Sequence, residues 1–291
     1  IVAVNELPDL AERIQVSMLN VMEERDIQIR GYVLRLPLDV LVMASANPED
    51  YTNRGRIITP LKDRFGSQIR THYPLDADTE ISIMRQEARS LSVGDVSVRV
   101  PHYLERVIAT FSQLARGSSQ VNQRSGVSVR LSVSNVEVVG ANALRRGLRG
   151  GEGAVVARVS DLQALPASTS GKVEIESFEE DRDGQILDNL VKAATLTVFR
   201  EVADQAKLTD VVTAFEAGAT ASAGESVSSS DLARLAYSIP AMAEAADALA
   251  AGDTDEPSLA AAVEFLLEGL HLSKRLNKDA GTYRGKNITR S

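Results

Sequence analysis

Two polar motifs follow apolar stretches of this chain, and both could take part in chemistry on a phosphate. Asn5 and Glu6 come directly after the apolar residues 1–4, and Asn47 follows the largely apolar run 40–46. Neither run alternates with polar residues, which predicts strands buried on both faces of a parallel sheet. The segment between them is long enough for the helical crossover that parallel strands require. Because ligands of open α/β sheets bind beyond the carboxyl ends of the strands, we expect Glu6 and Asn47 to face one crevice.

The types of these side chains suit hydrolysis. A carboxylate at Glu6 can orient or deprotonate a water molecule, and the amide of Asn47 can hold that water or a phosphate oxygen. Farther along the chain, Asp63 and Arg64 lie in a short polar turn. An arginine there can reach towards the phosphates of a neighbouring molecule, because its planar guanidinium makes bidentate contacts.

Each motif taken alone also has a plain structural interpretation. Asn5 and Glu6 could be a solvated strand end, and Asn47 with Pro48 could be ordinary turn chemistry. Arg64 could form a surface salt bridge with Asp63, which contributes little stability. The order and spacing of all the motifs together favour the functional interpretation.

The elements that must position these residues follow from hydrophobic periodicity and from breaker residues. An amphipathic helix is expected after Pro8, then a hairpin over residues 27–36 and a third strand over residues 67–73. After residue 74 the pattern predicts helices over residues 76–91, 101–117, 131–151, 186–202, 209–217, 231–251 and 257–278. Residues 217–230 are expected to be a flexible connector, because they are rich in Ser, Gly and Ala.

Composition excludes several classes of site. The 291 residues contain no Cys, which excludes disulfides and Cys-based zinc sites, and the three His residues lack the spacing of metal ligands. The net charge of −8 argues against a duplex-DNA partner, and we interpret Arg145, Arg146 and Arg149 as cations that favour a helix end.

No signal peptide and no membrane-spanning run is evident, so we expect no membrane insertion and a cytoplasmic location.

Five stretches, in order, carry a resemblance to a known family. They are IVAVNELPDL, RDIQIRGYVLRLP, VMASANPED, ITPLKDRFG and VRLSVSN. Together they resemble AAA+ ATPases of the helix-2-insert clade, above all the ATPase subunit of magnesium chelatase and its MoxR-like relatives. The resemblance covers about residues 1–150, and the order of five motifs is more specific than any one of them.

The resemblance implies roles for individual residues. Residues 1–6 match the Walker B strand, with Glu6 activating the attacking water, and Asn47 matches sensor 1. Arg64 matches the arginine finger that completes a neighbouring subunit's site. Arg130 matches the sensor 2 arginine that contacts the γ-phosphate in the same subunit, although Arg124 is an alternative for that role. The hairpin over residues 27–36 matches the pre-sensor-1 insertion, which contacts partners or substrates in the ring pore.

Two departures from the family pattern qualify these roles. Asn5 stands where the family has an Asp that holds Mg²⁺ through water, and a neutral amide is a weaker ligand. The sequence also contains no G-x-x-x-x-G-K-[ST] phosphate loop. We therefore expect the chain to be the carboxyl-terminal part of a longer protein. We further expect that residues 1–291 alone neither bind ATP tightly nor fold as a complete nucleotide domain.

The resulting expectation is an α/β fold with a partial AAA+ core followed by helical segments. Its expected parts are a nucleotide-binding part over residues 1–76, a helical lid over 77–165, a linker over 166–183 and a helical extension over 184–291. The expected cofactors are ATP and Mg²⁺.

The expected function is that of an ATP-hydrolysing motor or chaperone subunit in a homo-oligomeric ring. Its protein partner is expected to carry a von Willebrand A-type (VWA) domain. Two alternatives remain open: a regulatory or binding module that does not hydrolyse ATP, and a MoxR-type chaperone rather than a true chelatase subunit. An AAA+ transcription activator is disfavoured, because no GAFTGA-like element and no basic recognition helix is present.

Overall fold

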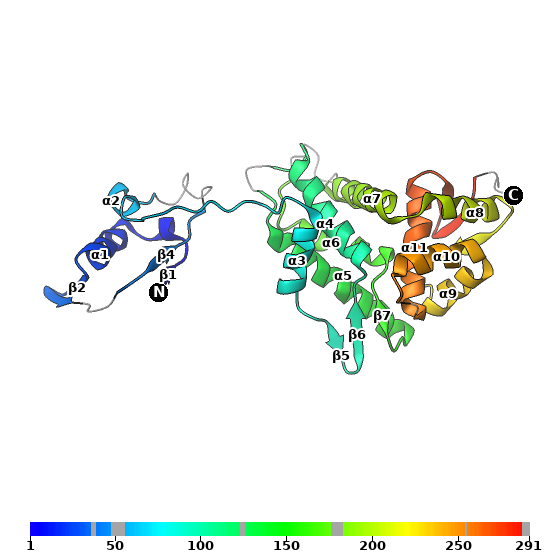
Figure 1. Cartoon of the computed structure of the whole chain (residues 1–291), viewed down its shortest axis with the longest axis horizontal. Coiled ribbons are helices and arrows are strands. Elements are labelled where there is room, and N and C mark those ends of the chain that lie inside the picture. The colour runs from blue at the N-terminus through cyan, green and yellow to red at the C-terminus, as the bar shows by residue number, and fades with distance from the viewer. Residues whose placement is uncertain (36–38, 48–55, 123–125, 176–182, 254, 287–291) are drawn as a thin grey trace. The chain divides into compact units, whose positions relative to one another are not determined.

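The computed structural model of the chain describes residues 1–35, 39–47, 56–122, 126–175, 183–253 and 255–286 (Figure 1). The chain divides into two compact units, Ile1–His72 and Tyr73–Ser291. Both contain helices together with small sheets, so the fold is mixed α/β. In the described part of the chain, no helix combines the length and the apolar character needed to cross a membrane.

The first unit is built from two pairs of strands and short helices. Its elements are β1 (Val2–Val4), the 3-10 helix η1 (Leu7–Asp9), α1 (Glu12–Glu23), β2 (Asp26–Ile29), β3 (Tyr32–Arg35), β4 (Val42–Ala44) and α2 (Thr59–Lys62). β1 and β4 pair in parallel, with Val2 opposite Val42 and Val4 opposite Ala44. β2 and β3 form the antiparallel hairpin that the sequence predicted. Its turn residues Arg30 and Gly31 both have positive φ, which matches the twist of two-residue hairpins.

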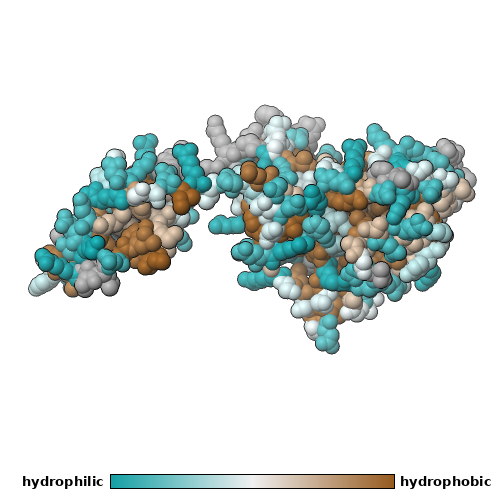
Figure 2. Space-filling view, in the orientation of Figure 1, coloured by the Kyte–Doolittle hydropathy of each residue, from teal (hydrophilic) through white to brown (hydrophobic). Residues whose placement is uncertain are grey.

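The prediction that β1 and β4 are buried on both faces is wrong for the described structure. Val2 is 46% exposed and Met43 is 57% exposed. A strand is covered on both faces only where further strands and helices flank it. Within the described residues this sheet has two strands, and α1 packs against β2 and α2. Brown apolar surface is accordingly visible on this unit in Figure 2.

The strand predicted over residues 67–73 is not formed. Residues 67–72 have no regular secondary structure, and Ile69 is almost fully exposed. A strand persists only where its backbone groups find hydrogen-bond partners. The described residues provide no third strand to the β1–β4 sheet, so an extended solvated segment results.

The second unit is mainly helical. Its elements up to residue 169 are α3 (Ala77–Glu87), β5 (Ser92–Val93), β6 (Val96–Arg99), α4 (His102–Gly117), α5 (Val129–Gly150), β7 (Val155–Val156), η3 (Val159–Ala164) and α6 (Leu165–Thr169). The remaining elements are α7 (Asp183–Val202), α8 (Gln205–Glu216), β8 (Thr220–Ser222), α9 (Ser229–Ser238), α10 (Pro240–Ala250), α11 (Glu256–Leu272), β9 (Leu276–Asp279) and β10 (Thr282–Gly285). One hydrophobic core runs through them, and α7 packs against both α4 and α11.

The segment expected to be a linker is partly packed. Helix α6 covers its start, Val173 is buried, and Val121 forms an isolated antiparallel bridge with Ile175. Residues 176–182 lie outside the described part of the chain. The expected lid and extension therefore belong to one compact unit, because apolar residues on both sides of the segment share a core.

The carboxyl-terminal part differs from the expected series of helices in three places. The helix predicted over residues 231–251 is two helices, because Pro240 removes a backbone donor and α9 ends at Ser238. The expected connector contains β8, which pairs with β10. The helix predicted over residues 257–278 ends at Leu272 and is followed by the β9–β10 hairpin, whose Leu276 and Tyr283 side chains are buried.

Candidate functional site

Parallel pairing places the polar residues that follow β1 and β4 at the same end of the sheet. Ser45 N donates to Val4 O at 2.9 Å, and Leu7 N donates to Ser45 O at 2.9 Å. Glu6 N donates to Ser45 Oγ at 3.1 Å. The predicted adjacency of the two strand ends is confirmed, because these hydrogen bonds continue the ladder past Val4.

The backbone at Glu6 is held in an unusual conformation. Its φ and ψ are both 52°, in the left-handed region. That conformation costs a residue other than glycine about 1–2 kcal/mol and is often found at functional sites. Hydrogen bonds from Glu6 N and Leu7 N to Ser45 hold the turn, while the side chains of Asn5, Glu6 and Asn47 are exposed. A fixed backbone thus presents a carboxylate and two amides to solvent.

Arg64 lies just after α2 and is held within its own unit. Its Nε donates to Glu23 Oε2 at 2.6 Å, its Nη2 also contacts Glu23, and its Nη1 donates to Pro60 O at 2.8 Å. The side chain is 32% exposed. The alternative interpretation predicted a salt bridge between Arg64 and Asp63. Arg64 does form a salt bridge, but with Glu23. The packing of α1 against α2 brings Glu23 to the guanidinium instead.

A buried glutamine that the sequence analysis did not single out supports this arrangement. Gln15 Nε2 donates to Leu10 O at 3.0 Å and to Arg56 O at 3.2 Å, and its Oε1 accepts from Ile58 N at 2.9 Å. These bonds tie α1 to the segment that leads into α2. One signal was available in the sequence, because Gln15 lies three and seven residues before Met18 and Met22 and therefore shares their face of the predicted helix.

Arg130 lies in the other unit. It is the second residue of α5, its side chain is exposed, and its backbone N donates to the capping Ser128 Oγ at 3.2 Å. The alternative residue for the same role, Arg124, lies outside the described residues.

Among the described residues, no group of three or more His, Cys, Asp or Glu side chains gathers as a metal site. The residues after β1 offer an exposed amide at Asn5 and an exposed carboxylate at Glu6. Mg²⁺ commonly binds through one or two protein ligands, waters and substrate phosphates. This donor set fits a metal held mainly by a nucleotide, and it does not fit a metal held by protein ligands alone.

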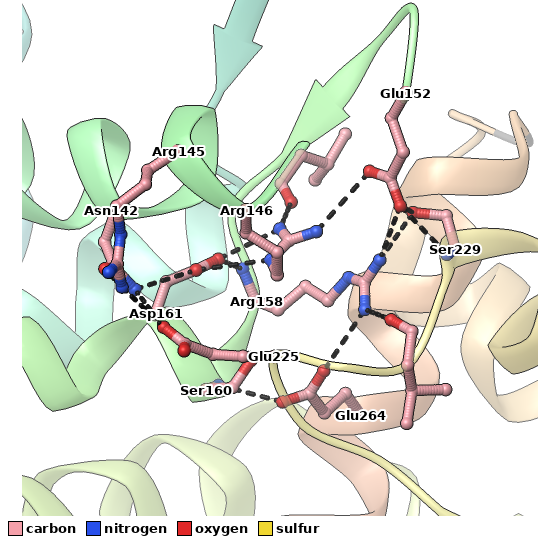
Figure 3. Close-up of polar contacts among 12 residues, drawn as sticks. Asn142, Arg145, Arg146, Glu152, Arg158, Ser160, Asp161, Glu225, Ser229 and Glu264 are labelled. Atoms are coloured by element: carbon pink, nitrogen blue, oxygen red, sulfur yellow. Dashed lines mark hydrogen bonds and ion pairs between the residues drawn. The ribbon is translucent and has the colours of Figure 1, made fainter. Parts of the chain in front are cut away.

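A second polar cluster lies inside the unit Tyr73–Ser291, and Figure 3 shows its members. Arg146 is 6% exposed and donates to Val156 O at 2.8 Å and to Asp161 Oδ2 at 3.0 Å. The interpretation of Arg146 as a cation at a helix end is therefore wrong. Burial of the residue against η3 accounts for the difference.

Arg158 is fully buried at the centre of this cluster. Its Nη2 donates to Ser229 Oγ at 2.6 Å and to Glu152 Oε1 at 3.1 Å, and its Nη1 donates to Val227 O at 2.7 Å. Burial lowers the pKa of Arg158, and the positive charge of Arg146 lowers it further. Breaking one partner of such a buried pair leaves an uncompensated charge, which is strongly destabilising.

Glu264 completes the cluster from α11 and is 3% exposed. Its Oε1 accepts from Ser160 N at 2.9 Å, and its Oε2 lies 3.9 Å from Arg158 Nη1. Burial raises the pKa of Glu264, while the positive charge of Arg158 opposes that shift. The sequence signal for this cluster is single charged residues inside apolar runs, as in AVVARVSDL and LAAAVEFLL.

No protein-family model matches this chain, and no curated protein matches it.

Proposed function

We propose that the chain belongs to an ATP-hydrolysing AAA+ motor or chaperone subunit, similar to the ATPase subunit of magnesium chelatase. The observation that carries this proposal is the parallel pairing of β1 with β4, which sets Glu6 beside the Ser45–Asn47 strand end. The mixed α/β fold is compatible with a partial AAA+ core followed by a helical lid. The order of the five sequence motifs adds the expectation of ATP as substrate.

In this proposal each candidate residue has a distinct task. The Glu6 carboxylate accepts a proton from the attacking water, and the Asn47 amide holds that water or a phosphate oxygen. Arg64 contacts the nucleotide of a neighbouring subunit in a homo-oligomeric ring, and Arg130 contacts the γ-phosphate of its own subunit. Bound ATP would supply the phosphoanhydride bond that is hydrolysed, and Mg²⁺ would neutralise negative charge on its phosphates.

The state of Arg64 has a consequence for this proposal. As an arginine finger it must present its guanidinium to another subunit, yet here Glu23 and Pro60 O occupy its Nε, Nη1 and Nη2 atoms. The ion pair is partly exposed, so it is weak enough to exchange for phosphate contacts. Assembly of the ring would then release Arg64 from Glu23.

A second candidate function has specific support. Asn5 replaces a carboxylate with a weaker ligand, and Arg64 is engaged within its own unit. Both observations favour a regulatory or binding module in which nucleotide is bound but not hydrolysed. Within the motor class, a MoxR-type chaperone with a VWA-domain partner is the alternative to a chelatase subunit.

ATP turnover of the protein as its gene encodes it separates these candidates. We expect Glu6→Gln to lower turnover about 100-fold or more, because it removes the proton acceptor. Arg64→Ala should lower turnover about 1000-fold, because the developing charge on the phosphates loses its partner. Binding of a fluorescent ATP analogue should persist in Glu6→Gln.

Two exposed residues of α1 provide matched controls. Glu12→Gln and Arg13→Ala make the same changes in charge on the same unit and should leave turnover within about twofold of wild type. Wild-type protein that binds the analogue without turnover supports the regulatory module instead. Turnover that persists in Glu6→Gln would refute the motor proposal.

A further inference from the structure

The unit Tyr73–Ser291 contains a cavity of about 640 Å³ that the proposed ATP chemistry does not use. Residues of η3, α7, α11, the β9–β10 hairpin and the segment 223–226 after β8 line it. Apolar side chains form part of its wall, namely Val159, Leu162, Val191 and Leu272. Ser160 and the buried Glu264 add polar atoms to the same lining. A volume of this size is in the range of cavities that bind small molecules.

The charges that line the cavity cancel in pairs, with one exception. Lys278 Nζ contacts Glu268 Oε2 at 2.7 Å, and Arg145 Nη2 contacts Glu225 Oε1 at 2.8 Å. Asp188 and Lys192 carry opposite charges one helical turn apart on α7. The carboxylate of Glu264 remains.

The cluster behind the cavity does not neutralise Glu264 either. Arg146 and Arg158 contribute two positive charges, while Glu152, Asp161 and ionised Glu264 contribute three negative charges. Asp161 already accepts from Arg146 and from Arg158 N, and Glu152 from Arg158 Nη2 (Figure 3). The cluster therefore keeps a net charge of about −1 when Glu264 is ionised.

Two buried polar atoms beside the cavity also lack hydrogen-bond partners among the described residues. They are Glu264 Oε2, which has only the 3.9 Å approach of Arg158, and Ser160 Oγ. The two residues are neighbours in space, because Ser160 N donates to Oε1, the other carboxylate oxygen of Glu264. An unsatisfied buried carboxylate oxygen is costly, so such a pair calls for a donor from a ligand.

We propose that this cavity binds a small organic cation with a primary ammonium group and an aliphatic chain. The ammonium group donates to Glu264 Oε2 and to Ser160 Oγ and neutralises the remaining negative charge. The chain packs on Val159, Leu162, Val191 and Leu272. A metal ion is a poorer fit, because the described residues hold no group of three ligating side chains. An anion would face an uncompensated carboxylate.

The test uses the full chain and n-butylammonium chloride as the probe, followed by calorimetry and by thermal unfolding. We expect saturable binding and a rise in Tm, because the ligand binds the folded state only. Uncharged 1-butanol should give no saturable binding, and sodium chloride at matched ionic strength should give no comparable rise. Equal effects of butanol or of sodium chloride would overturn the proposal.

Variants locate the site. Glu264→Gln should weaken binding at least about tenfold, because a charged acceptor is lost, and Ser160→Ala about fivefold. Glu244→Gln, an exposed carboxylate on α10 outside the cavity, should bind like the wild type. Equal binding by wild type and Glu264→Gln would show that the cation binds elsewhere on this acidic protein and would refute the site. Should Glu264→Gln fail to fold, an unchanged affinity of Ser160→Ala refutes it instead.

Discussion

Glu264 shows how much the environment of one residue determines its behaviour. It lies in the middle of the apolar helix α11, with Phe265 on one side in sequence and Val263 on the other. The groups that interact with it are Arg158, Ser160, Asp161, Tyr103 and Tyr283. Burial and the charge of Glu264 raise the pKa of Tyr103. A carboxyl group in this position is more easily protonated than in water.

The stability of the protein should therefore depend on pH through Glu264. Burial raises its pKa above the ordinary 4.5, so the folded state keeps the proton to a higher pH than the unfolded chain does. The contribution of Glu264 to stability is then fully present below pH 4.5 and is lost as pH rises through the raised pKa. Glu264→Gln keeps the acceptor for Ser160 N and cannot ionise. We expect its free energy of unfolding, relative to wild type, to increase with pH across that window.

Urea unfolding of wild type and Glu264→Gln from about pH 4 to about pH 8 measures the difference in their free energies of unfolding. The contributions of the other titrating groups largely cancel in that difference. The exposed control Glu244→Gln should show no comparable trend. A difference between Glu264→Gln and wild type that is constant across the range would contradict the assigned environment of Glu264.

At the scale of elements, local signals predicted helices well. Asp76 caps α3 by accepting from Thr79 N at 2.7 Å, Pro101 precedes α4, and Gly151 ends α5 with a left-handed backbone. These features depend only on residues close in sequence, so they can be predicted from the sequence alone. The β2–β3 hairpin was predictable for the same reason.

Long-range pairings were harder to predict. β8 pairs with β10 across about sixty residues, and nothing in the Ser- and Gly-rich stretch around it indicates a strand. The adjacency of the ends of β1 and β4 was predictable, because parallel strands place their carboxyl ends together. The contact of Arg64 with Glu23 depends on how α1 packs against α2, so sequence spacing alone could not identify it.

Helix packing in the second unit gives a direct prediction at Gly269. This residue of α11 lies against Phe199 of α7, and a Cβ atom there would overlap the phenyl ring. We expect Gly269→Ala to lower the free energy of unfolding by about 1–3 kcal/mol through overpacking, despite the higher helix propensity of Ala.

Gly184→Ala on α7 is the matched control, because a Cβ there meets no atom of the described residues within 4 Å. Because Gly184 lies in the first turn of the helix, the change should be neutral or slightly stabilising. Both values come from urea unfolding. A Gly269→Ala protein as stable as the wild type would contradict the close contact of α7 with α11.

At the scale of the whole molecule, the proposed site needs more than one chain. Glu6, Asn47 and Arg64 belong to the unit Ile1–His72, whereas Arg130 belongs to the unit Tyr73–Ser291. Arg64 would act on a neighbour, which implies a heterologous interface that closes into a ring. Glu6 of one subunit and Arg64 of its neighbour would then act together at each interface, and not within one subunit.

Mixing two inactive variants tests this central claim most directly. The two substitutions are made in the protein as its gene encodes it, and equal amounts of the Glu6→Gln and Arg64→Ala subunits are co-assembled. The mixture should recover about a quarter of the wild-type ATP turnover. Random mixing gives that share of interfaces an intact Glu6 opposite an intact Arg64. Co-purification of untagged Glu6→Gln subunits with affinity-tagged Arg64→Ala subunits reports whether the two variants co-assemble. Turnover of the Glu6→Gln and Arg64→Ala mixture that stays at the level of the separate variants would contradict the account.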